Sequence, residues 1–359
     1  MKKIILLVFL FLTTSCEKNS TSPGESSCGC QGSSDNTSWT FVANEGPYSG
    51  ESYVSMIDDR GNVFQSETLG NIVHAVEVYN DKLIVSVNGS EKVVTFDINE
   101  QGLTNPFEID FSGTPPREIE VVGNKAYISC FGDSDYTVYQ IEPGFIKVLD
   151  LETLAIESTI EVGIMPEGML YDSGYLWVAN SQESTLSKID ITSSIVSETI
   201  DVGKGPQNLT IHNNEVYVSR RWYEVYEVDD AGLWLDYEEL HGSSMIAGSE
   251  IVKRDYSSGV VCGGSVLSFN DTVYRSYSGG ISPLDSELNL ETVGRIGNYD
   301  IDVYHVEVVD GFLWLGFSGG SDSSYNELNG SVKVIDPSGS ERFSFDVGIN
   351  PGDFAHWSK

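Results

Sequence analysis

Short apolar runs separated by polar turns fill the chain from residue 39 onward, and one of these runs recurs at regular intervals. Each copy follows a turn and carries an aromatic or aliphatic pair, as in YLWVAN at 175 and FLWLGF at 312. Seven copies begin at residues 40, 82, 125, 175, 215, 272 and 312. This spacing, a little over forty residues, predicts that the chain is built from one repeating unit.

Within one unit, four short runs rich in β-branched and aromatic residues alternate with turns, and no long helical period intervenes. Four antiparallel strands in a unit of this length describe a propeller blade. We therefore predict an all-β, seven-bladed β-propeller over residues 39–359. The C-terminal DVGINPGDFAHW supplies an inner strand that the N-terminal WTFVAN lacks, so we expect the ring to close by pairing near Phe354 and Phe41.

An apolar residue followed by aspartate ends the next strand of most units. Such a carboxylate either ligates calcium or caps its own turn by accepting a backbone N–H two residues on. Because each unit supplies one aspartate, far from the others, we expect turn caps. The residues are Asp58, Asp97, Asp150, Asp190, Asp255 and Asp336.

Three short motifs follow one another in the fourth unit. They are Val178-Ala179-Asn180, Ile189-Asp190, and Val202-Gly203 with Pro206. These motifs resemble the YVTN repeat, and with its N-terminal sequence the chain resembles the YncE-like propeller lipoproteins of the Bacteroidetes type. The resemblance implies a seven-bladed propeller. Some relatives are surface proteins that hold cobalamin and pass it to a TonB-dependent transporter.

The first fifteen residues, with basic Lys2 and Lys3 before an apolar run, are typical of a secretory signal peptide. Small residues before Cys16 resemble a bacterial lipobox, which predicts that Cys16 is acylated, although an ordinary cleaved signal is the alternative. Residues 16–38 are rich in Ser, Gly and Asn and predict a flexible tether. We expect a lipoprotein of the outer membrane, facing either the medium or the periplasm and touching the membrane through its lipid alone.

The chain has a formal net charge of −34, which disfavours nucleic acid as a partner. Of the five cysteines, Cys130 and Cys262 lie in apolar strands and are expected to be buried small hydrophobes. Cys28 and Cys30 form a CGC motif in the tether, where a local disulfide, an intermolecular bridge and free thiols all remain open. No C-x-x-C pair supports a structural zinc site.

Insertions between the second and third strands of four units mark where the chain departs from its own repeat. They span 45–52, 131–145, 220–245 and 319–330, and all four are expected on one face of the propeller. Long loops on a rigid scaffold are common binding sites. Aromatic and arginine side chains are concentrated there, as recognition surfaces favour. The alternative is that these aromatics pack together to hold their own loop.

The candidate binding residues come from these insertions and from the starts of the inner strands. Arg220, Arg221, Trp222 and Tyr223 are expected to begin where a strand ends and to face Tyr136 across a cleft. Eight residues before each strand marker lies a position expected at the mouth of the central channel. His74, Arg117, Glu167 and Gln207 are expected to form the floor of the site in this way, and the candidate His305 stands beside Tyr304, the position that the last marker gives.

These residues favour a non-catalytic protein that captures a small molecule, a nutrient or a cofactor such as a corrinoid, and hands it to a transporter. The arginine pair beside aromatics indicates an anionic or amide-rich, partly planar ligand. The alternatives are a lactonase- or lyase-like propeller enzyme using His74, Glu167 and His305, and a protein-protein scaffold. The sequence shows no G-x-S-x-G and no H-E-x-x-H motif, so we nominate no catalytic residue, bound metal or cofactor.

Overall fold

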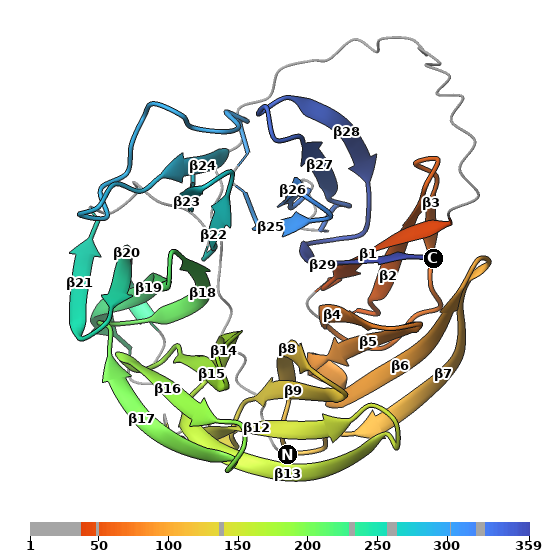
Figure 1. Ribbon diagram of the computed structural model, residues 1–359, viewed down its shortest axis with the longest axis horizontal. Coiled ribbons are helices and arrows are strands. Elements are labelled where there is room, and N and C mark those ends of the chain that lie inside the picture. Colours follow the sequence, from red (N-terminus) through yellow and green to blue (C-terminus); the bar gives the residue numbers. More distant parts are fainter. Residues whose placement is uncertain are drawn as a thin grey trace.

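The computed structural model describes residues 37–47, 50–135, 140–229, 234–256, 264–301, 303–320 and 327–359. The predicted signal peptide, Cys16, Cys262 and the tether up to residue 36 lie outside these ranges. Seven antiparallel sheets stand around a central axis (Figure 1). Within the described ranges, no helix has the length and apolarity that crossing a membrane requires.

Blades 1 to 4 each contain four strands, which follow one another from the axis outward. Blade 1 is β29 (Pro351–Ser358), β1 (Ser38–Asn44), β2 (Tyr53–Asp58) and β3 (Val63–Gln65). Blade 2 is β4 (Val73–Tyr79), β5 (Lys82–Val87), β6 (Lys92–Asn99) and β7 (Gly102–Asp110), with the 3-10 turn η1 (Asn88–Ser90) between β5 and β6. Blade 3 is β8 (Pro116–Val122), β9 (Lys125–Cys130), β12 (Pro143–Asp150) and β13 (Ala155–Ile164). Blade 4 is β14 (Pro166–Asp172), β15 (Tyr175–Asn180), β16 (Thr185–Asp190) and β17 (Ile195–Asp201).

Blades 5 to 7 complete the ring. Blade 5 is β18 (Pro206–His212), β19 (Glu215–Val228), β20 (Trp234–Ala247) and β21 (Glu250–Asp255). Blade 6 is β22 (Val266–Phe269), β23 (Thr272–Tyr277) and β24 (Gly280–Pro283), and isolated bridges such as Leu284 with Leu290 follow in place of a regular fourth strand. Blade 7 is β25 (His305–Val309), β26 (Phe312–Phe317), β27 (Ser331–Ile335) and β28 (Glu341–Asp346). A short pair, β10 (Ser134–Asp135) with β11 (Gln140–Ile141), extends the blade 3 insertion.

The ring closes as predicted, and the seven-bladed all-β fold is confirmed. Strand β29 pairs with β1, with Phe354 opposite Val42 and Ala355 opposite Phe41. Neighbouring inner strands contact one another all the way round, including β29 with β4. The apolar cores lie between adjacent blades, as in the cluster of Phe41, Val85 and Trp357 that joins blades 1 and 2. Burial of these faces, rather than one central core, holds the propeller together.

The glycine of the Val-Gly-x-x-Pro element lies against the asparagine that ends the repeated strand marker. A Cβ atom at Gly163 would lie 2.5 Å from Asn180, and one at Gly348 would lie 2.5 Å from Asn44. In blade 4 the Gly163 amide donates a hydrogen bond to Asn180 Oδ1 at 3.1 Å. The repeat therefore needs glycine here because a buried asparagine side chain occupies the space.

Four of the six motif aspartates cap their turns as expected. Asp58, Asp150, Asp190 and Asp336 each accept a backbone N–H from the residue two positions on. Asp97 instead binds the Lys82 and Asn105 side chains, and Asp255 pairs with Arg220, so these two depart from the prediction. Asp285 caps a turn in blade 6, where no motif marked it. Cys130 is buried, as predicted, and burial raises the pKa of its thiol to about 12.

Candidate functional site

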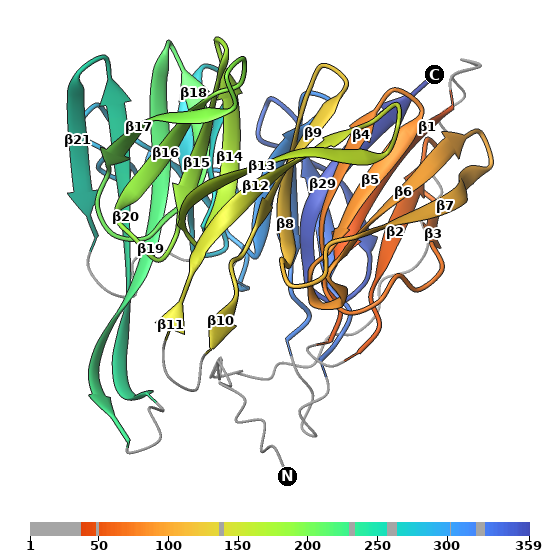
Figure 2. The same cartoon turned by 90° about the horizontal axis from the view of Figure 1, so that it is seen from below.

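The inner strands begin on the same face of the disc that carries the insertions (Figure 2). His74, Arg117, Glu167 and Gln207 each lie at the second position of an inner strand, and His305 begins β25. The side chain of Glu307, also on β25, remains 40% exposed although its strand is enclosed by the ring. Solvent therefore reaches the axis, and we call this space the axial channel and its insertion-bearing end the mouth.

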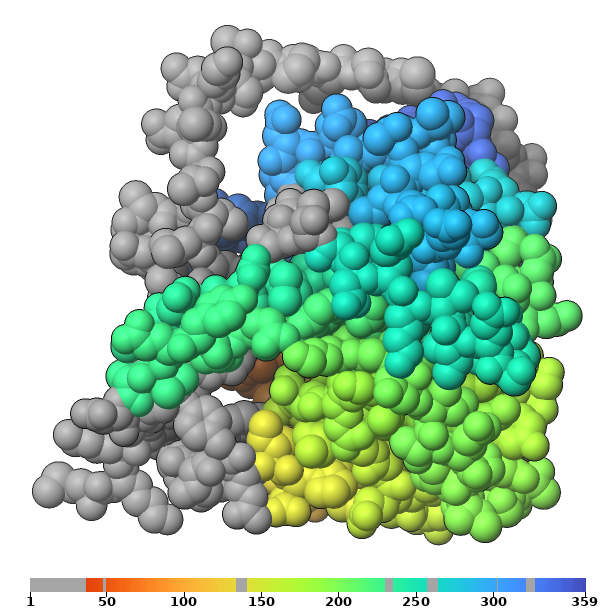
Figure 3. Space-filling model, turned by 90° about the vertical axis from the view of Figure 1, so that its left-hand side faces the viewer, coloured from red at the N-terminus to blue at the C-terminus, as the bar shows by residue number. Residues whose placement is uncertain are grey.

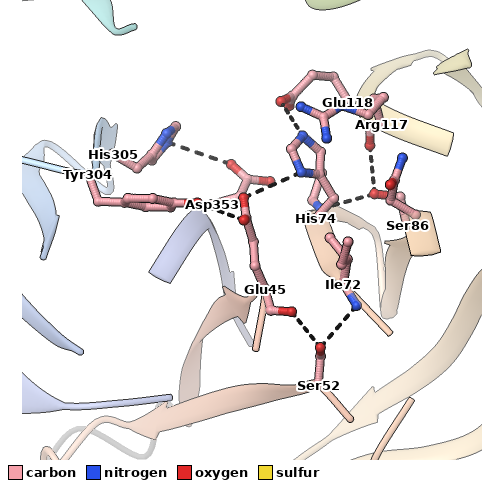
Figure 4. Close-up of polar contacts among 12 residues, drawn as sticks. Glu45, Ser52, Ile72, His74, Ser86, Arg117, Glu118, Tyr304, His305 and Asp353 are labelled. Carbon is pink, nitrogen blue, oxygen red and sulfur yellow. Dashed lines mark hydrogen bonds and ion pairs between the residues drawn. The ribbon is translucent and has the colours of Figure 1, made fainter. Parts of the chain in front are cut away.

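His74 is held between two carboxylates at the mouth (Figure 4). Its Nε2 lies 3.1 Å from Glu118 Oε1 and its Nδ1 lies 3.5 Å from Glu45 Oε1. Burial and the charge of Arg117 act to lower the pKa of His74, but the hydrogen bonds to Glu118 and Glu45 outweigh them and raise it to about 9. His74 is thus an imidazolium at neutral pH and has no lone pair with which to accept a substrate proton.

Arg117 and Glu167 join blades 3 and 4 beside this group. Arg117 Nε donates to one oxygen of Glu167 at 3.0 Å, and its terminal nitrogen donates to both oxygens, at 2.9 and 2.8 Å. The guanidinium also lies 4.9 Å from the ring centre of Phe131. The enzyme alternative loses support, because two of its three named residues, His74 and Glu167, are each engaged by an opposite charge.

Glu45, which the sequence analysis missed, links blade 7 to this cluster. The Tyr304 hydroxyl donates to Glu45 Oε2 at 2.6 Å. Burial acts to raise the pKa of Glu45, and the hydrogen bond and charge of His74, with the Tyr304 hydroxyl, lower it below its usual range. The Glu45 backbone is fixed by Ser52, whose hydroxyl donates to the Glu45 carbonyl and accepts from the Ile72 amide. Its position directly after the repeated strand marker was the available clue.

His305 lies away from His74, with two acidic side chains of its own. Its Nε2 is 3.7 Å from Glu307 Oε2 and 3.9 Å from Asp353 Oδ1. Burial lowers the pKa of His305. Burial and the charge of Glu118 raise the pKa of Glu307 to about 8, and burial with the charge of Glu307 raises that of Asp353 well above its usual range.

The wall of the channel carries further carboxyl groups beyond these residues. Glu77 on β4 has its pKa raised to about 8 by burial and by the charges of Glu307 and Glu120. Burial raises the pKa of Glu120 on β8 to about 7. These carboxyl groups make the channel an acidic environment.

Gln207 contributes less than predicted, since the hydrogen bond found for its amide is to the neighbouring Pro206 carbonyl, at 3.3 Å.

The blade 5 insertion is a β-hairpin and not a loop, so the predicted strand end at Arg220 is wrong. β19 and β20 pair from Val216 with Ile246 to Val228 with Trp234, with register shifts between Val225 and Glu227 and between Glu227 and Val228. The resulting arm projects well beyond the disc (Figure 3). Successive side chains of a strand point to opposite faces, so the four adjacent candidates Arg220 to Tyr223 cannot act as one surface.

One face of the arm carries Arg221, Tyr223 and Tyr237. Arg221 Nε donates to Glu239 at 2.6 Å, and its terminal nitrogen donates to the Tyr223 hydroxyl, also at 2.6 Å. Burial raises the pKa of Tyr304 at the mouth well above its usual value, and the charge of Arg221 opposes this shift. Tyr223 and Tyr237 pack edge to face, with ring centres 5.9 Å apart. This face offers aromatic surface and a guanidinium already paired with a carboxylate.

The opposite face carries Arg220 and Trp222. Trp222 lines a hollow of about 520 Å³ on this face, together with Lys204, Lys253 and Asp255. Arg220 is 2% exposed and binds Asp255 and the Arg254 carbonyl. It occupies the strand position of Asn180 and Asn44, and a Cβ at the motif glycine Gly203 would lie 2.8 Å from it. Arg220 is thus a structural residue, which corrects its placement among the exposed binding candidates.

The remaining candidate, Tyr136, lies outside the described residues, as do Tyr48 and Tyr325 from the other insertions. The cleft expected between Tyr136 and the blade 5 insertion is therefore untested. Within the described ranges, His74, Arg117 and Glu167 come together at the mouth, while Arg221 and Tyr223 contact each other and Glu239 on the arm.

No family model matches the chain, and no curated protein matches it. Solved structures do resemble it. A putative 6-phosphogluconolactonase from Bacteroides uniformis is 12% identical, with a TM-score of 0.56 over 90% of this chain and 100% of that one. The computationally designed Ika8 protein is 11% identical, with a TM-score of 0.52 over 89% and 99%. The dihydro-heme d1 dehydrogenase NirN, in complex with DHE, is 14% identical, with a TM-score of 0.49 over 88% and 74%.

These neighbours are β-propellers, so the comparison supports the fold. At such low identity it carries no substrate, cofactor or reaction to this chain. The resemblance to YVTN-repeat lipoproteins stays a prediction.

Proposed function

We propose that the protein is an envelope-anchored binding protein that captures a small molecule at the mouth of its axial channel. The observation that carries this proposal is the group of Glu45, His74 and Arg117 at the mouth, on the same face of the ring from which the aromatic-bearing arm projects. Rigid aromatic surface near converging polar groups is the usual composition of a small-molecule site. An arm this long has no role in the packing of the repeat itself.

The charges at the mouth favour a ligand with hydrogen-bond donors or a positive charge. Arg117 at the mouth is already matched by Glu167, and Arg221 on the arm by Glu239. An anionic ligand would have to compete with these carboxylates and would face the acidic wall of the channel. The paired guanidinium groups weaken the expectation of an anionic ligand, and we favour an amine- or amide-rich molecule that uses Tyr223 and Tyr237 for stacking.

We further propose that Cys16 carries the lipid that holds the protein at the outer membrane, and that the captured molecule passes to a TonB-dependent transporter. The N-terminal sequence and the resemblance to YncE-like lipoproteins support both steps. A corrinoid, which offers many side-chain amides, is the first ligand to test. A transporter or corrinoid-handling gene beside the gene of this protein would add support.

A thermal-shift screen of the mature chain tests the proposal, because a ligand that binds the native state alone raises the unfolding temperature. The panel contains corrinoids, amino acids, polyamines and sugar lactones. Tyr223→Ala should abolish the shift, while Trp222→Ala, one position away on the other face, should leave it unchanged. The reverse pattern would place binding in the hollow at Trp222, and turnover of a lactone would instead favour the enzyme alternative.

A further inference from the structure

Two groups of histidine and carboxylate side chains lie along the axial channel, each with its ligand atoms within 4.8 Å of one another. They are His74 with Glu118 and Glu167, and His305 with Glu307 and Asp353. The first group is satisfied by protein charges, since His74 is an imidazolium and Arg117 binds both oxygens of Glu167. A protonated histidine cannot ligate a metal ion. The charges of the first group are therefore balanced as they stand, although His74 Nδ1 makes no regular hydrogen bond and only faces Glu45 Oε1 at 3.5 Å.

The second group differs from the first because no arginine or lysine in the described ranges forms an ion pair with Glu307 or Asp353. Within the described residues, His305 Nε2 and Glu307 Oε2 are buried and make no hydrogen bond. Buried polar atoms without a partner are costly, so such a pair requires an explanation. The explanation is that His305, Glu307 and Asp353 face one another without the cation that would bind them.

The protein also orients these three groups toward a common point. The Val76 amide donates a hydrogen bond to Asp353 Oδ2 at 2.8 Å, which leaves Oδ1 directed toward His305. The His305 ring packs against Phe354, with ring centres 5.5 Å apart. Contacts of this kind outside the ligand set fix the direction of metal ligands. His305 and Glu307 also lie two residues apart on β25 and therefore share one face of the strand.

We propose that His305, Glu307 and Asp353 form a binding site for a divalent transition-metal ion that enters through the axial channel. Ligand atoms that share an ion at about 2.1 Å lie about 3.4 Å apart in a tetrahedral site. The observed separations of 3.7 and 3.9 Å need to close by only a few tenths of an ångström. One imidazole with two carboxylates suits Zn²⁺ or Mn²⁺, whereas Ca²⁺ and Mg²⁺ prefer oxygen alone.

The surroundings favour a cation at this point. Glu77, Glu118 and Glu120 add carboxyl groups to the same channel, and a bound cation would stabilise the charged forms of Glu77 and Glu120, which burial disfavours. Three protein ligands leave a coordination position open to water or to a ligand atom. The inference is independent of the proposed function, because none of the three ligands belongs to the Arg221–Tyr223 face or to the His74 cluster.

A shared proton is the competing explanation. One proton held between Glu307 and Asp353 would relieve their repulsion without any metal ion. The two explanations differ in a direct measurement. The mature protein, treated with a chelator, is titrated with Zn²⁺ against a chromophoric competitor at neutral pH, beside the variants His305→Ala, Asp353→Asn and the matched control His212→Gln.

We expect one Zn²⁺ per chain, at least about tenfold weaker binding in His305→Ala and Asp353→Asn, and no change in His212→Gln. His212, at the far end of β18, binds Ser268, and its substitution controls for effects that removal of any histidine would have. No binding by the wild type, or equal binding by His305→Ala, overturns the site in favour of the shared proton. Should the variants fail to fold, NMR of the wild type decides, because Zn²⁺ must shift the ring signals of His305 and leave those of His212 in place.

Discussion

The guanidinium of Arg117 on blade 3 binds both carboxylate oxygens of Glu167 on blade 4, with nitrogen–oxygen distances of 2.8 to 3.0 Å. The two side chains are only 21% and 15% exposed, so their charges are largely removed from water. The pair therefore joins adjacent inner strands at a place where either charge alone would be poorly solvated.

From this pair we predict that Glu167→Gln lowers the free energy of unfolding by about 2–3 kcal/mol, because Arg117 loses its counter-charge. The double variant Arg117→Met with Glu167→Leu should recover most of the loss, since it leaves no buried charge. Urea denaturation of the ligand-free protein measures both. A double variant less stable than Glu167→Gln would show that the pair contributes net stability.

The pKa of His74 should be shifted in the opposite direction from the pKa values of three other histidines. Because Glu118 and Glu45 flank it, His74 should show an NMR midpoint near pH 9, while burial should hold His241, His305 and His356 below their ordinary pKa of 6.5. Ring-proton chemical shifts followed against pH measure each one. A midpoint for His74 below 6.5 would mean that it is neutral and that the mouth lacks its imidazolium.

The same residue makes stability depend on pH. The pKa of His74 is higher in the folded chain, about 9, than its ordinary 6.5, so the stability it contributes is complete below pH 6.5 and is lost as the pH rises toward 9. The loss should reach about 3 kcal/mol. Glu77 and Glu307, with raised pKa values, act in the same direction, so the comparison is made with His74→Gln, whose stability should fall less steeply over this range.

Substitution of the adjacent residues Arg220 and Arg221 should lower the stability of the fold by very different amounts. Arg220→Ala should destabilise the fold by about 3 kcal/mol, because it empties a buried position and removes the partner of two carbonyl groups. Arg221→Ala should cost less than about 1 kcal/mol, since its ion pair with Glu239 is partly exposed. Thermal unfolding of both variants tests this. Equal losses would contradict the assignment of Arg220 as structural and Arg221 as partly exposed.

Lipid anchoring has its own test. Cys16→Ala should move the protein from the membrane fraction to the soluble fraction after cell lysis, because the acylated residue is lost. Immunoblotting of the two fractions measures the change, with Cys28→Ala as the matched control. Retention of Cys16→Ala in the membrane fraction would mean that another segment holds the protein there.

The repeat, the blade number and the closing strand pair were all predictable, because each depends on local periodicity that the sequence displays openly. Counting back from the strand markers also located His74, Arg117 and Glu167. Glu45 was missed although it directly follows a strand marker, and Asp353 was missed because it reaches Val76 and His305 only when β29 completes blade 1. Proximity of that kind arises from ring closure and leaves no local pattern.

The arm was predicted wrongly for a different reason. The length of the insertion indicated a loop, although the segment from Arg220 to Val228 alternates between residue types and is rich in aromatic and β-branched side chains. That alternation separates Arg220 and Trp222 from Arg221 and Tyr223. Arg220 could also have been recognised as structural, since it stands where the repeat places asparagine.

The strand that completes blade 1, β29, follows all the other described strands of the ring in the sequence. Until β29 arrives, β1 presents an unpaired edge, and Trp39 and Phe41 lack the partners Ala355 and Trp357 in their cluster. A nascent or truncated chain thus cannot reach the native state, however many blades it has already formed. Quality control of this protein accordingly depends on β29, and a frameshift that removes β29 should eliminate the whole folded product and not merely one strand.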